Sequence, residues 1–221
     1  MKKLCAVAVL VVAAAFAFGQ GISIGGGLSY GSQWLAAGGS ESGIDASESG
    51  AFPQFGFHAF VDMKYVQIGL GYLMNSSQSL VTKVTGFSDT TTNTNDKASW
   101  LDIDVVGKYP FDLGGFTLFP LAGAEYLLNL TYTDSSGNDL KASMPSGERN
   151  WLDALMLKVG IGADIPLSDH FYLRPEGFLG YKLIKSTYDN DLADTLKGSG
   201  FSNTYVNWWE IRGMVLVGYK L

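Results

Sequence analysis

The sequence LDIDVVGKY, residues 101–109, decides the fold of this chain. Its apolar row holds Leu101, Ile103, Val105 and Tyr109, and its charged row holds Asp102, Asp104 and Lys108. Alternation with a period of two is the pattern of a β-strand, because successive side chains point to opposite faces of a sheet. One face of this strand therefore contacts an apolar environment, and the other face carries charge.

Seven further segments after residue 20 alternate in the same way, so the sequence predicts eight strands. These segments begin near Ile22, Phe55, Val66, Phe116, Leu155, Phe171 and Trp209. Short turns at about 62–64, 110–115 and 166–170 alternate with long polar stretches. The long stretches are the Gly-, Ser- and Ala-rich residues after Tyr30 and the residues at about 76–99, 133–150 and 186–204. This connectivity indicates consecutive hairpins with one short end and one long end.

A closed membrane barrel explains both the strand length and the two unlike faces. A strand of about ten residues, tilted by roughly 45°, crosses the hydrocarbon core of a bilayer. Every backbone polar group in lipid needs a partner, which either helices or a closed barrel supply. After residue 20 no apolar run approaches the length of a spanning helix. The sequence predicts an all-β, eight-stranded antiparallel up-and-down transmembrane β-barrel.

The first 20 residues have the three regions of a secretory signal peptide. Lys2 and Lys3 precede an apolar run from Leu4 to Phe18, and Ala17 closes an Ala-x-Ala site. We expect residues 1–20 to be cleaved and residues 21–221 to form the barrel domain. The only cysteine, Cys5, leaves with the leader, so we expect neither disulfides nor thiol chemistry in the mature chain.

Export and strand count together predict the location and orientation of the barrel. We expect it in the outer membrane of a diderm bacterium. An even number of strands places both termini in the periplasm with the short turns, and the four long loops then face outward. Loss of Lys2 and Lys3 makes the formal charge of −6 more negative by two. Such an acidic chain lacks the basic patches that nucleic-acid binding requires.

Aromatic residues are expected to form two bands, one at each membrane interface. The band near the long loops holds Tyr30, Trp34, Phe55, Tyr72, Trp100, Tyr132, Trp151 and Trp209. The band near the short turns holds Tyr109, Phe111, Phe116, Phe171 and Tyr219. Two girdles of this kind are typical of membrane barrels.

The leader, the eight alternating segments, the long loops and the ending Tyr219-Lys220-Leu221 resemble the small outer-membrane barrels typified by OmpA, OmpX and OmpW. The resemblance covers residues 21–221 and is one of architecture rather than of a diagnostic motif. It implies contact with outer-membrane lipid and with lipopolysaccharide or its equivalent. It also implies that the barrel-assembly machinery recognises the last strand through Val217, Tyr219 and Leu221, although a terminal Phe is commoner in that family. We expect a monomer.

Ten charged residues occupy the rows predicted to face the barrel interior. They are Asp102, Asp104, Lys108, Glu125, Lys158, Arg174, Glu176, Lys182, Glu210 and Arg212. The interior of an eight-stranded barrel is only wide enough for side chains to fill it, and charges there avoid a large desolvation penalty only when they are paired. We therefore expect a paired network, in which Glu210 and Arg212 contact Arg174, Glu176 and Lys182. In the alternative, some of these charges gate or line a narrow conduit.

Paired glycines recur on the same interior rows. They are Gly25 with Gly27, Gly69 with Gly71, and Gly160 with Gly162. A phosphate-binding loop would need a strand followed by a helix, and that context is missing. We expect these glycines to make room for long side chains opposite them.

The residues offer little for catalysis. Nucleophilic catalysis needs a base beside a nucleophile, and the chain has two histidines. His170 falls in a short turn, and His58 is expected to be a hydrogen-bonded interior side chain. We predict no enzymatic activity, no cofactor and no metal.

An acidic cluster in the fourth long loop, Asp189, Asp191 and Asp194 with Asn190, has the oxygen ligands that calcium prefers. It lacks the glycine and the distal Glu of an EF-hand loop. We expect a solvated acidic loop.

Three functions are compatible with these patterns. The first is a non-enzymatic outer-membrane protein whose loops serve adhesion, environmental contact or envelope integrity. The second is a narrow, porin-like channel for small or hydrophobic solutes, similar to OmpW, which the apolar interior residues Phe119, Leu121 and Leu127 favour. The third is a soluble lipocalin-type barrel, in which the apolar rows would face inward.

Overall fold

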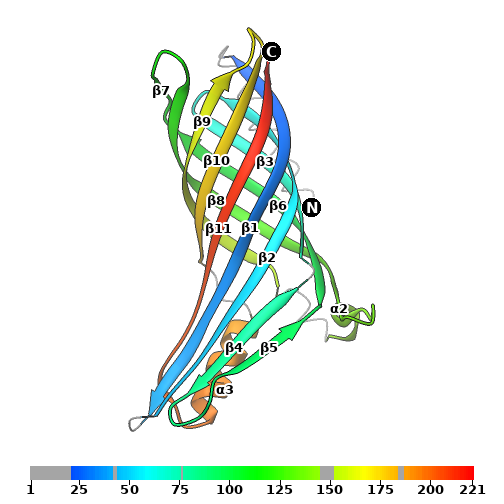
Figure 1. The fold of residues 1–221 in the computed structure, drawn as a ribbon, viewed down its shortest axis with the longest axis vertical. Helices are drawn as coiled ribbons and strands as arrows, with labels where there is room; N and C mark the ends of the chain where they lie inside the picture. The colour runs from blue at the N-terminus through cyan, green and yellow to red at the C-terminus, as the bar shows by residue number, and fades with distance from the viewer. Residues whose placement is uncertain (1–20, 42–43, 76, 145–151, 184–186) are drawn as a thin grey trace.

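The computed structural model describes residues 21–41, 44–75, 77–144, 152–183 and 187–221. The expected signal peptide at residues 1–20 lies outside the described residues. Within the described residues, eight long strands form the wall of a barrel (Figure 1). They are β1 (Ile22–Glu41), β2 (Ile44–Met63), β3 (Val66–Asn75), β6 (Lys97–Lys108), β8 (Thr117–Thr133), β9 (Ala154–Pro166), β10 (Phe171–Lys182) and β11 (Ser202–Lys220).

The barrel is closed by its first and last strands. Each wall strand pairs antiparallel with its neighbour in the chain, and β1 pairs with both β2 and β11. The closing register runs from Ser23 opposite Lys220 to Ser40 opposite Ser202. Since closure leaves no open edge among these eight strands, their backbone groups are paired around the ring. The predicted eight-stranded antiparallel up-and-down fold is confirmed.

Additional elements lie mostly at the end of the barrel away from the C-terminus, which we call the long-loop end (Figure 1). They are the hairpin β4 (Gln78–Val84) and β5 (Thr90–Thr94), and the helices α2 (Leu140–Ser143) and α3 (Thr187–Gly198). A further short strand, β7 (Phe111–Asp112), pairs with β8 at the opposite, short-turn end. No helix among the described residues is long and apolar enough to span a membrane.

The first long stretch was predicted as a loop, and this prediction is wrong. β1 continues beyond Tyr30 to Glu41, and β2 already begins at Ile44, before Phe55. The two strands pair without a break from Tyr30 opposite Phe55 to Glu41 opposite Ile44. β4 adds to the outer part of β2, so the extension is a small sheet rather than an irregular loop. The extension of β1 buries Leu35 and Ala37 in a small apolar cluster with Val206. Its other residues are mostly small or polar, so it lacks the alternation by which the other strands were predicted.

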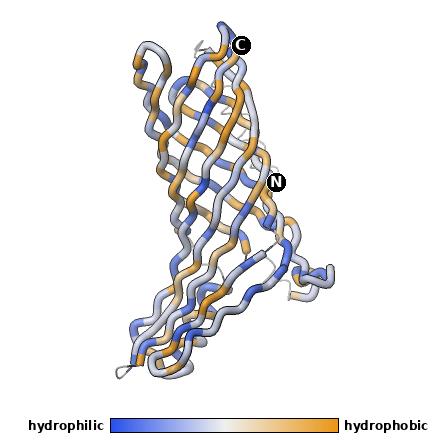
Figure 2. The backbone as a smooth tube through the Cα atoms, in the orientation of Figure 1, coloured by the Kyte–Doolittle hydropathy of each residue, from blue (hydrophilic) through white to orange (hydrophobic). Residues whose placement is uncertain are grey.

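The two faces of the wall have opposite chemistry. Large apolar side chains point outward on every wall strand, among them Leu28, Phe57, Leu70, Val105, Tyr126, Val159, Leu179 and Val215. The buried charged side chains of the wall strands all point inward, where they share the interior with apolar side chains. Hydrophobic and hydrophilic residues alternate along much of the wall (Figure 2). This is the polarity of a barrel surrounded by hydrocarbon. The lipocalin alternative, which required apolar rows inside, is wrong.

Two apolar layers pack inside the barrel around the charged middle. The layer at the short-turn end holds Phe60, Val106, Phe119, Leu121, Tyr172, Phe178, Met214 and Leu216. The layer at the long-loop end holds Leu73, Ala98, Trp100, Leu127, Ala154 and Met156. Phe119, Leu121 and Leu127 are therefore packed side chains of two separate layers rather than one continuous apolar path.

Two of the aromatics predicted for the two bands do not lie on the outer surface in the described part of the chain. Ten of the expected aromatics are exposed on the barrel surface: Tyr30, Trp34, Phe55, Tyr72, Trp209, Tyr109, Phe111, Phe116, Phe171 and Tyr219. Trp100 instead lies in the interior and is buried, since it shares the inward row of Asp102 on β6. Tyr132 is half-buried beside the same interior layer. Trp151 lies outside the described residues.

Candidate functional site

All ten predicted interior charges have side chains inside the barrel. The most exposed of them, Lys182, has a side chain that is 8% exposed. They come from β6, β8, β9, β10 and β11, at alternate positions whose side chains share one face of each strand. Eight of them form two networks, Lys182 pairs with Asp189, and Asp104 lies beside His58.

The first network, which we call the Arg174 network, lies at the short-turn end. The guanidinium of Arg174 donates to Asp62 Oδ2 at 2.5 Å, to Asp164 Oδ1 at 2.6 Å and to Gln67 Oε1 at 2.7 Å. Lys108 Nζ donates to the same Asp62 oxygen at 2.6 Å. Glu176 completes the network, because its carboxylate accepts from Gln67 Nε2 at 3.2 Å.

Aromatic rings enclose the Arg174 guanidinium. Its central carbon lies 4.7 Å from the ring centre of Phe60, 4.9 Å from that of Tyr172 and 5.1 Å from that of Phe119. A delocalised guanidinium stacks on rings while its planar edge donates to carboxylates. The apolar layer and the Arg174 network therefore form one packed unit.

Three residues of the Arg174 network were not among the predicted site residues. Asp62 and Gln67 are adjacent to a short turn in the sequence, and Asp164 lies near the end of β9. Asp62 shares the interior row of β2 with His58, and Gln67 shares that of β3 with Gly69, so row membership could have found both. Asp164 likewise continues the interior row of Lys158, Gly160 and Gly162 on β9, and only its contact with Arg174 needed the structure.

The second network, the Arg212 network, lies in the middle of the barrel. Arg212 Nη1 donates to Asp102 Oδ2 at 2.6 Å and to Glu125 Oε1 at 2.5 Å, and Nη2 pairs with Glu210. Lys158 Nζ lies 3.1 Å from Glu125 Oε2. Every side chain in this network is at most 1% exposed. These paired charges cross the lumen from β11 to β6 and β8 on the far wall.

The predicted pairing of Glu210 and Arg212 with Arg174, Glu176 and Lys182 is wrong. In the register of β10 and β11, Phe178 stands opposite Arg212, and Gly180 stands opposite Glu210. The neighbouring strand therefore offers Arg212 a ring and no carboxylate. Arg212 spans the lumen instead and reaches β6 and β8 on the far wall.

Lys182 belongs to neither network. Its Nζ lies 2.8 Å from Asp189 Oδ2, and Trp208 Nε1 donates to Asp189 Oδ1 at 2.7 Å. Asp189 is buried, so the prediction of a solvated acidic loop is wrong at this residue. Asp194 remains exposed and pairs with Lys197 on α3. Asp189 thus ties the start of α3 to the mouth of the barrel.

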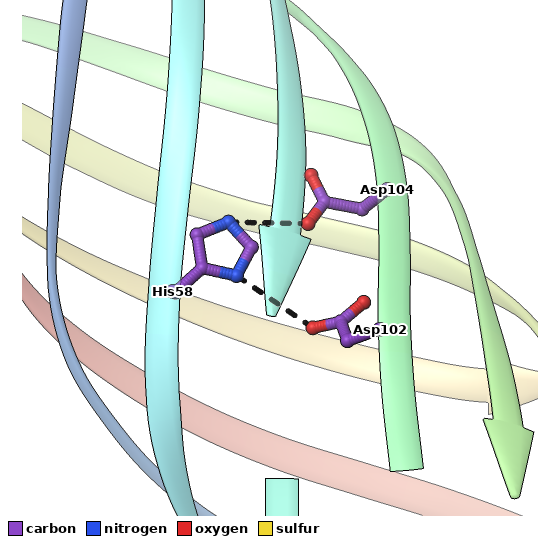
Figure 3. A group of neighbouring side chains, drawn as sticks. All are labelled: His58, Asp102 and Asp104. Atoms are coloured by element: carbon purple, nitrogen blue, oxygen red, sulfur yellow. Dashed lines mark ion pairs between the residues drawn. The ribbon is translucent and has the colours of Figure 1, made fainter. Parts of the chain in front are cut away.

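His58 differs from the prediction of a hydrogen-bonded histidine. It is 3% exposed and points inward from β2, and among the described residues neither ring nitrogen has a hydrogen-bond partner. Its neighbours are the carboxylates of Asp102 and Asp104 on β6 (Figure 3). The other histidine, His170, stacks on Tyr219 at the short-turn end.

A cavity of about 210 Å³ lies next to the apolar layer at the long-loop end of the barrel. We call it the mouth cavity. Rings and aliphatic side chains form much of its lining, including Phe52, Leu80, Trp100, Leu152, Met156 and Trp208. Gln78, Asp96, Tyr132 and Lys182 add polar groups. The cavity is large enough for a small amphipathic molecule, and it shares Trp100 and Met156 with the apolar layer at the long-loop end.

Tyr132 and Asp96 place a hydrogen-bonded pair at the wall of this cavity. The phenol of Tyr132 donates to Asp96 Oδ2 at 3.3 Å. Gln78 Nε2 donates to the same carboxylate oxygen at 3.2 Å. Because these polar groups stand beside rings, the cavity favours ligands that carry an apolar body and a polar end.

Comparison with known proteins yields no family. No family model matches the chain, and no curated protein matches it. Among solved structures, Neisserial surface protein A is similar with 14% identity and a TM-score of 0.41, covering 89% of this chain and 99% of that one. The outer membrane protease OmpT from Escherichia coli is 10% identical with a TM-score of 0.45, covering 91% and 97%. Ail, the attachment invasion locus protein of Yersinia pestis, is 10% identical with a TM-score of 0.42, covering 91% and 99%. Identities this low do not transfer a function, so the chain is placed by its own geometry as an eight-stranded barrel with an apolar outer surface and a charged interior.

Proposed function

We propose that this chain is an integral outer-membrane protein without enzymatic activity, whose barrel anchors a rigid external platform. The platform would serve adhesion, environmental contact or envelope integrity. The observation that carries this proposal is the filled lumen: two networks of paired charges and two apolar layers occupy the barrel interior. A barrel filled in this way works as an anchor, and its exposed outer elements are then the parts available for recognition.

The external platform consists of the extended ends of β1 and β2 with β4, β5 and α3. Thr85, which follows β4, exchanges hydrogen bonds with Asp45 near the tip of β2. Two apolar side chains are left exposed at this tip, Ile44 at 50% and Phe87 at 77%. Exposed aromatics on a rigid support are suited to binding a partner.

The proposed orientation places the short turns and both termini in the periplasm and the platform outside the cell. Exposed Tyr219 and Leu221 on and after the closing strand are available to the barrel-assembly machinery. The outward apolar rows contact outer-membrane lipid and lipopolysaccharide or its equivalent. The chain closes its own barrel, which supports a monomer.

Cysteine labelling in intact cells tests this orientation, because the sequence after residue 20 contains no cysteine of its own. Phe87→Cys, on the platform, is expected to react with a membrane-impermeant maleimide. Asp169→Cys, in an exposed short turn, is the matched control and is expected to react only after the outer membrane is permeabilised. Equal labelling of both sites, or recovery of the protein in the soluble fraction, would contradict the proposal.

A second candidate function is a narrow channel for small or hydrophobic solutes. The mouth cavity favours it, since an apolar chamber at the long-loop end could receive such a solute. The two charged networks between this cavity and the short-turn end oppose passage through the lumen. Single-channel recording and liposome swelling separate the two functions: the anchor predicts no stable large conductance and no solute-dependent swelling, and the channel predicts uptake.

A further inference from the structure

We propose that His58, Asp102 and Asp104 bind a divalent transition-metal ion inside the barrel, with zinc as the reference ion. This site adds to the proposed function, since an anchor without enzymatic activity needs no metal. Its role would be structural, joining β2 to β6 across β3.

The three side chains converge from two strands that are not adjacent in the wall. His58 comes from β2 and both aspartates come from β6, and β3 runs between these strands (Figure 3). His58 Nδ1 lies 3.7 Å from Asp102 Oδ2, and His58 Nε2 lies 3.3 Å from Asp104 Oδ2. One ligand atom from each residue lies within 4.8 Å of the others.

Each of the three residues has a buried polar atom that lacks a hydrogen-bond partner among the described residues. These atoms are both ring nitrogens of His58, Oδ1 of Asp102 and Oδ2 of Asp104. Buried polar atoms are nearly always satisfied, and leaving one unsatisfied costs about 1–3 kcal/mol. At the site itself, His58 and Asp104 offer unsatisfied lone pairs, whereas the Asp102 oxygen that faces His58, Oδ2, also accepts from Arg212 Nη1 at 2.6 Å. A bound cation would take one ring nitrogen of His58 together with the carboxylate oxygens.

Two glycines on β3 make the space in which these side chains meet. In the sheet register Gly71 lies between His58 and Asp102, and Gly69 stands opposite Asp104. A Cβ atom at Gly69 would lie 2.3 Å from both Asp104 Oδ2 and His58 Nε2. The predicted role of this glycine pair, to make room for long side chains, is therefore realised at the candidate metal site.

The charge of the surrounding residues favours a bound cation. Asp104 and the Arg212 network together present four carboxylates, and Arg212 and Lys158 are the two permanent cations that pair with them. The carboxylates of this buried group outnumber its permanent cations by two. Uncompensated charge in a low-dielectric interior is costly. A cation bound beside His58 would offset this surplus of carboxylates and take a lone pair of the imidazole.

The ligand set selects the kind of ion. One imidazole nitrogen and two carboxylate oxygens suit zinc and related transition metals, whereas calcium and magnesium prefer oxygen alone. Zinc binds these atoms at about 2.0–2.2 Å, so the three side chains would close slightly around the ion. Water could occupy the fourth position.

Metal content of the full mature chain tests the proposal. The protein is folded into detergent micelles after treatment with chelator, dialysed against zinc, and measured by elemental analysis. We expect about one zinc ion per wild-type chain, and X-ray absorption at the zinc edge should show one imidazole among oxygen ligands. His58→Ala and Asp104→Asn are expected to weaken zinc binding by at least tenfold, as roughly 10-fold to 100-fold losses follow even changes around metal ligands.

Glu176→Gln is the matched control, because Glu176 is a comparably buried carboxylate in the Arg174 network. It should keep full zinc occupancy. Heat-modifiable gel mobility checks that each variant is folded. A folded wild-type chain that binds no zinc and no manganese would overturn the proposal even if no variant folds, and so would full zinc occupancy in both ligand variants. Neither result would affect the labelling experiment on which the proposed function rests.

Discussion

Removal of the Arg212 guanidinium is the most direct perturbation of the filled lumen. Arg212 contacts Asp102 at 2.6 Å and Glu125 at 2.5 Å and also pairs with Glu210, and each of these side chains is at most 1% exposed. In Arg212→Met the apolar chain length is kept and the charge is lost. Three buried carboxylates then face one another with a single lysine, Lys158, nearby.

The magnitude follows from the burial of this group. Breaking a buried ion pair by removing one partner costs about 3–5 kcal/mol, because it leaves an uncompensated charge. We therefore expect Arg212→Met to lower the free energy of unfolding by about 3–5 kcal/mol. The exposed pair of Lys83 and Asp89, with side chains 57% and 53% exposed, is the internal control. Lys83→Met should change the free energy of unfolding by about 0–1 kcal/mol.

Urea unfolding of the folded protein in lipid vesicles, followed by tryptophan fluorescence, measures both variants. Conductance of the same samples in planar bilayers shows whether loss of Arg212 opens the lumen, and we expect brief openings in Arg212→Met that wild type lacks. A change of less than about 1 kcal/mol for Arg212→Met, equal to that of an exposed pair, would refute the inference that the network fills and stabilises the lumen.

Three further outcomes test other parts of the structure. Gly69→Ala should lower the free energy of unfolding by about 1–3 kcal/mol through overpacking. In the control, Gly177→Ala, the added Cβ meets no atom within 4 Å, so its free energy of unfolding should stay within about 0.5 kcal/mol of wild type. Urea unfolding measures both variants, and equal effects would contradict the close packing around Gly69. Trp100→Ala should cost about 3–5 kcal/mol as a buried side chain, and a cost below about 1 kcal/mol would instead indicate a lipid-facing tryptophan. Hydrogen bonds from the side chain and backbone of Asn138 lower the pKa of Asp134. The turn should therefore be stabilised at pH values above the ordinary carboxyl pKa, and it should lose this stabilisation as the pH falls through the lowered pKa. An NMR titration midpoint of Asp134 at or above the ordinary carboxyl pKa would contradict this.

Strand periodicity made the wall of the barrel predictable. Wherever one row meets lipid and the other meets the lumen, as from Leu101 to Tyr109, two environments impose two kinds of residue. The same principle explains the failures. The extension of β1 to Glu41 continues beyond the strands that alternate and buries Leu35 and Ala37 in a small apolar cluster, but its small residues show no regular alternation of apolar and polar rows. Trp100 was placed with the interface aromatics although its row already pointed inward.

The members of the interior networks were predictable, and their partners were not. Row membership follows from parity along one strand, so all ten charged residues could be placed inside. Pairing depends on the register of neighbouring strands and on the distance across the lumen. It therefore took the closed barrel to join Arg212 to Asp102 and Glu125, and Arg174 to Asp62.

The sequence by itself determined the class of this protein, because an alternating pattern repeated eight times allows few structures other than a closed barrel with lipid outside. Only the tertiary structure decided where chemistry can occur. His58 is far from Asp102 in the chain. The two side chains meet because β3, which lies between their strands, has a glycine, Gly71, at the position that pairs with both residues. Such a meeting depends on register and on a missing side chain, and neither is written in the alternation of a single strand.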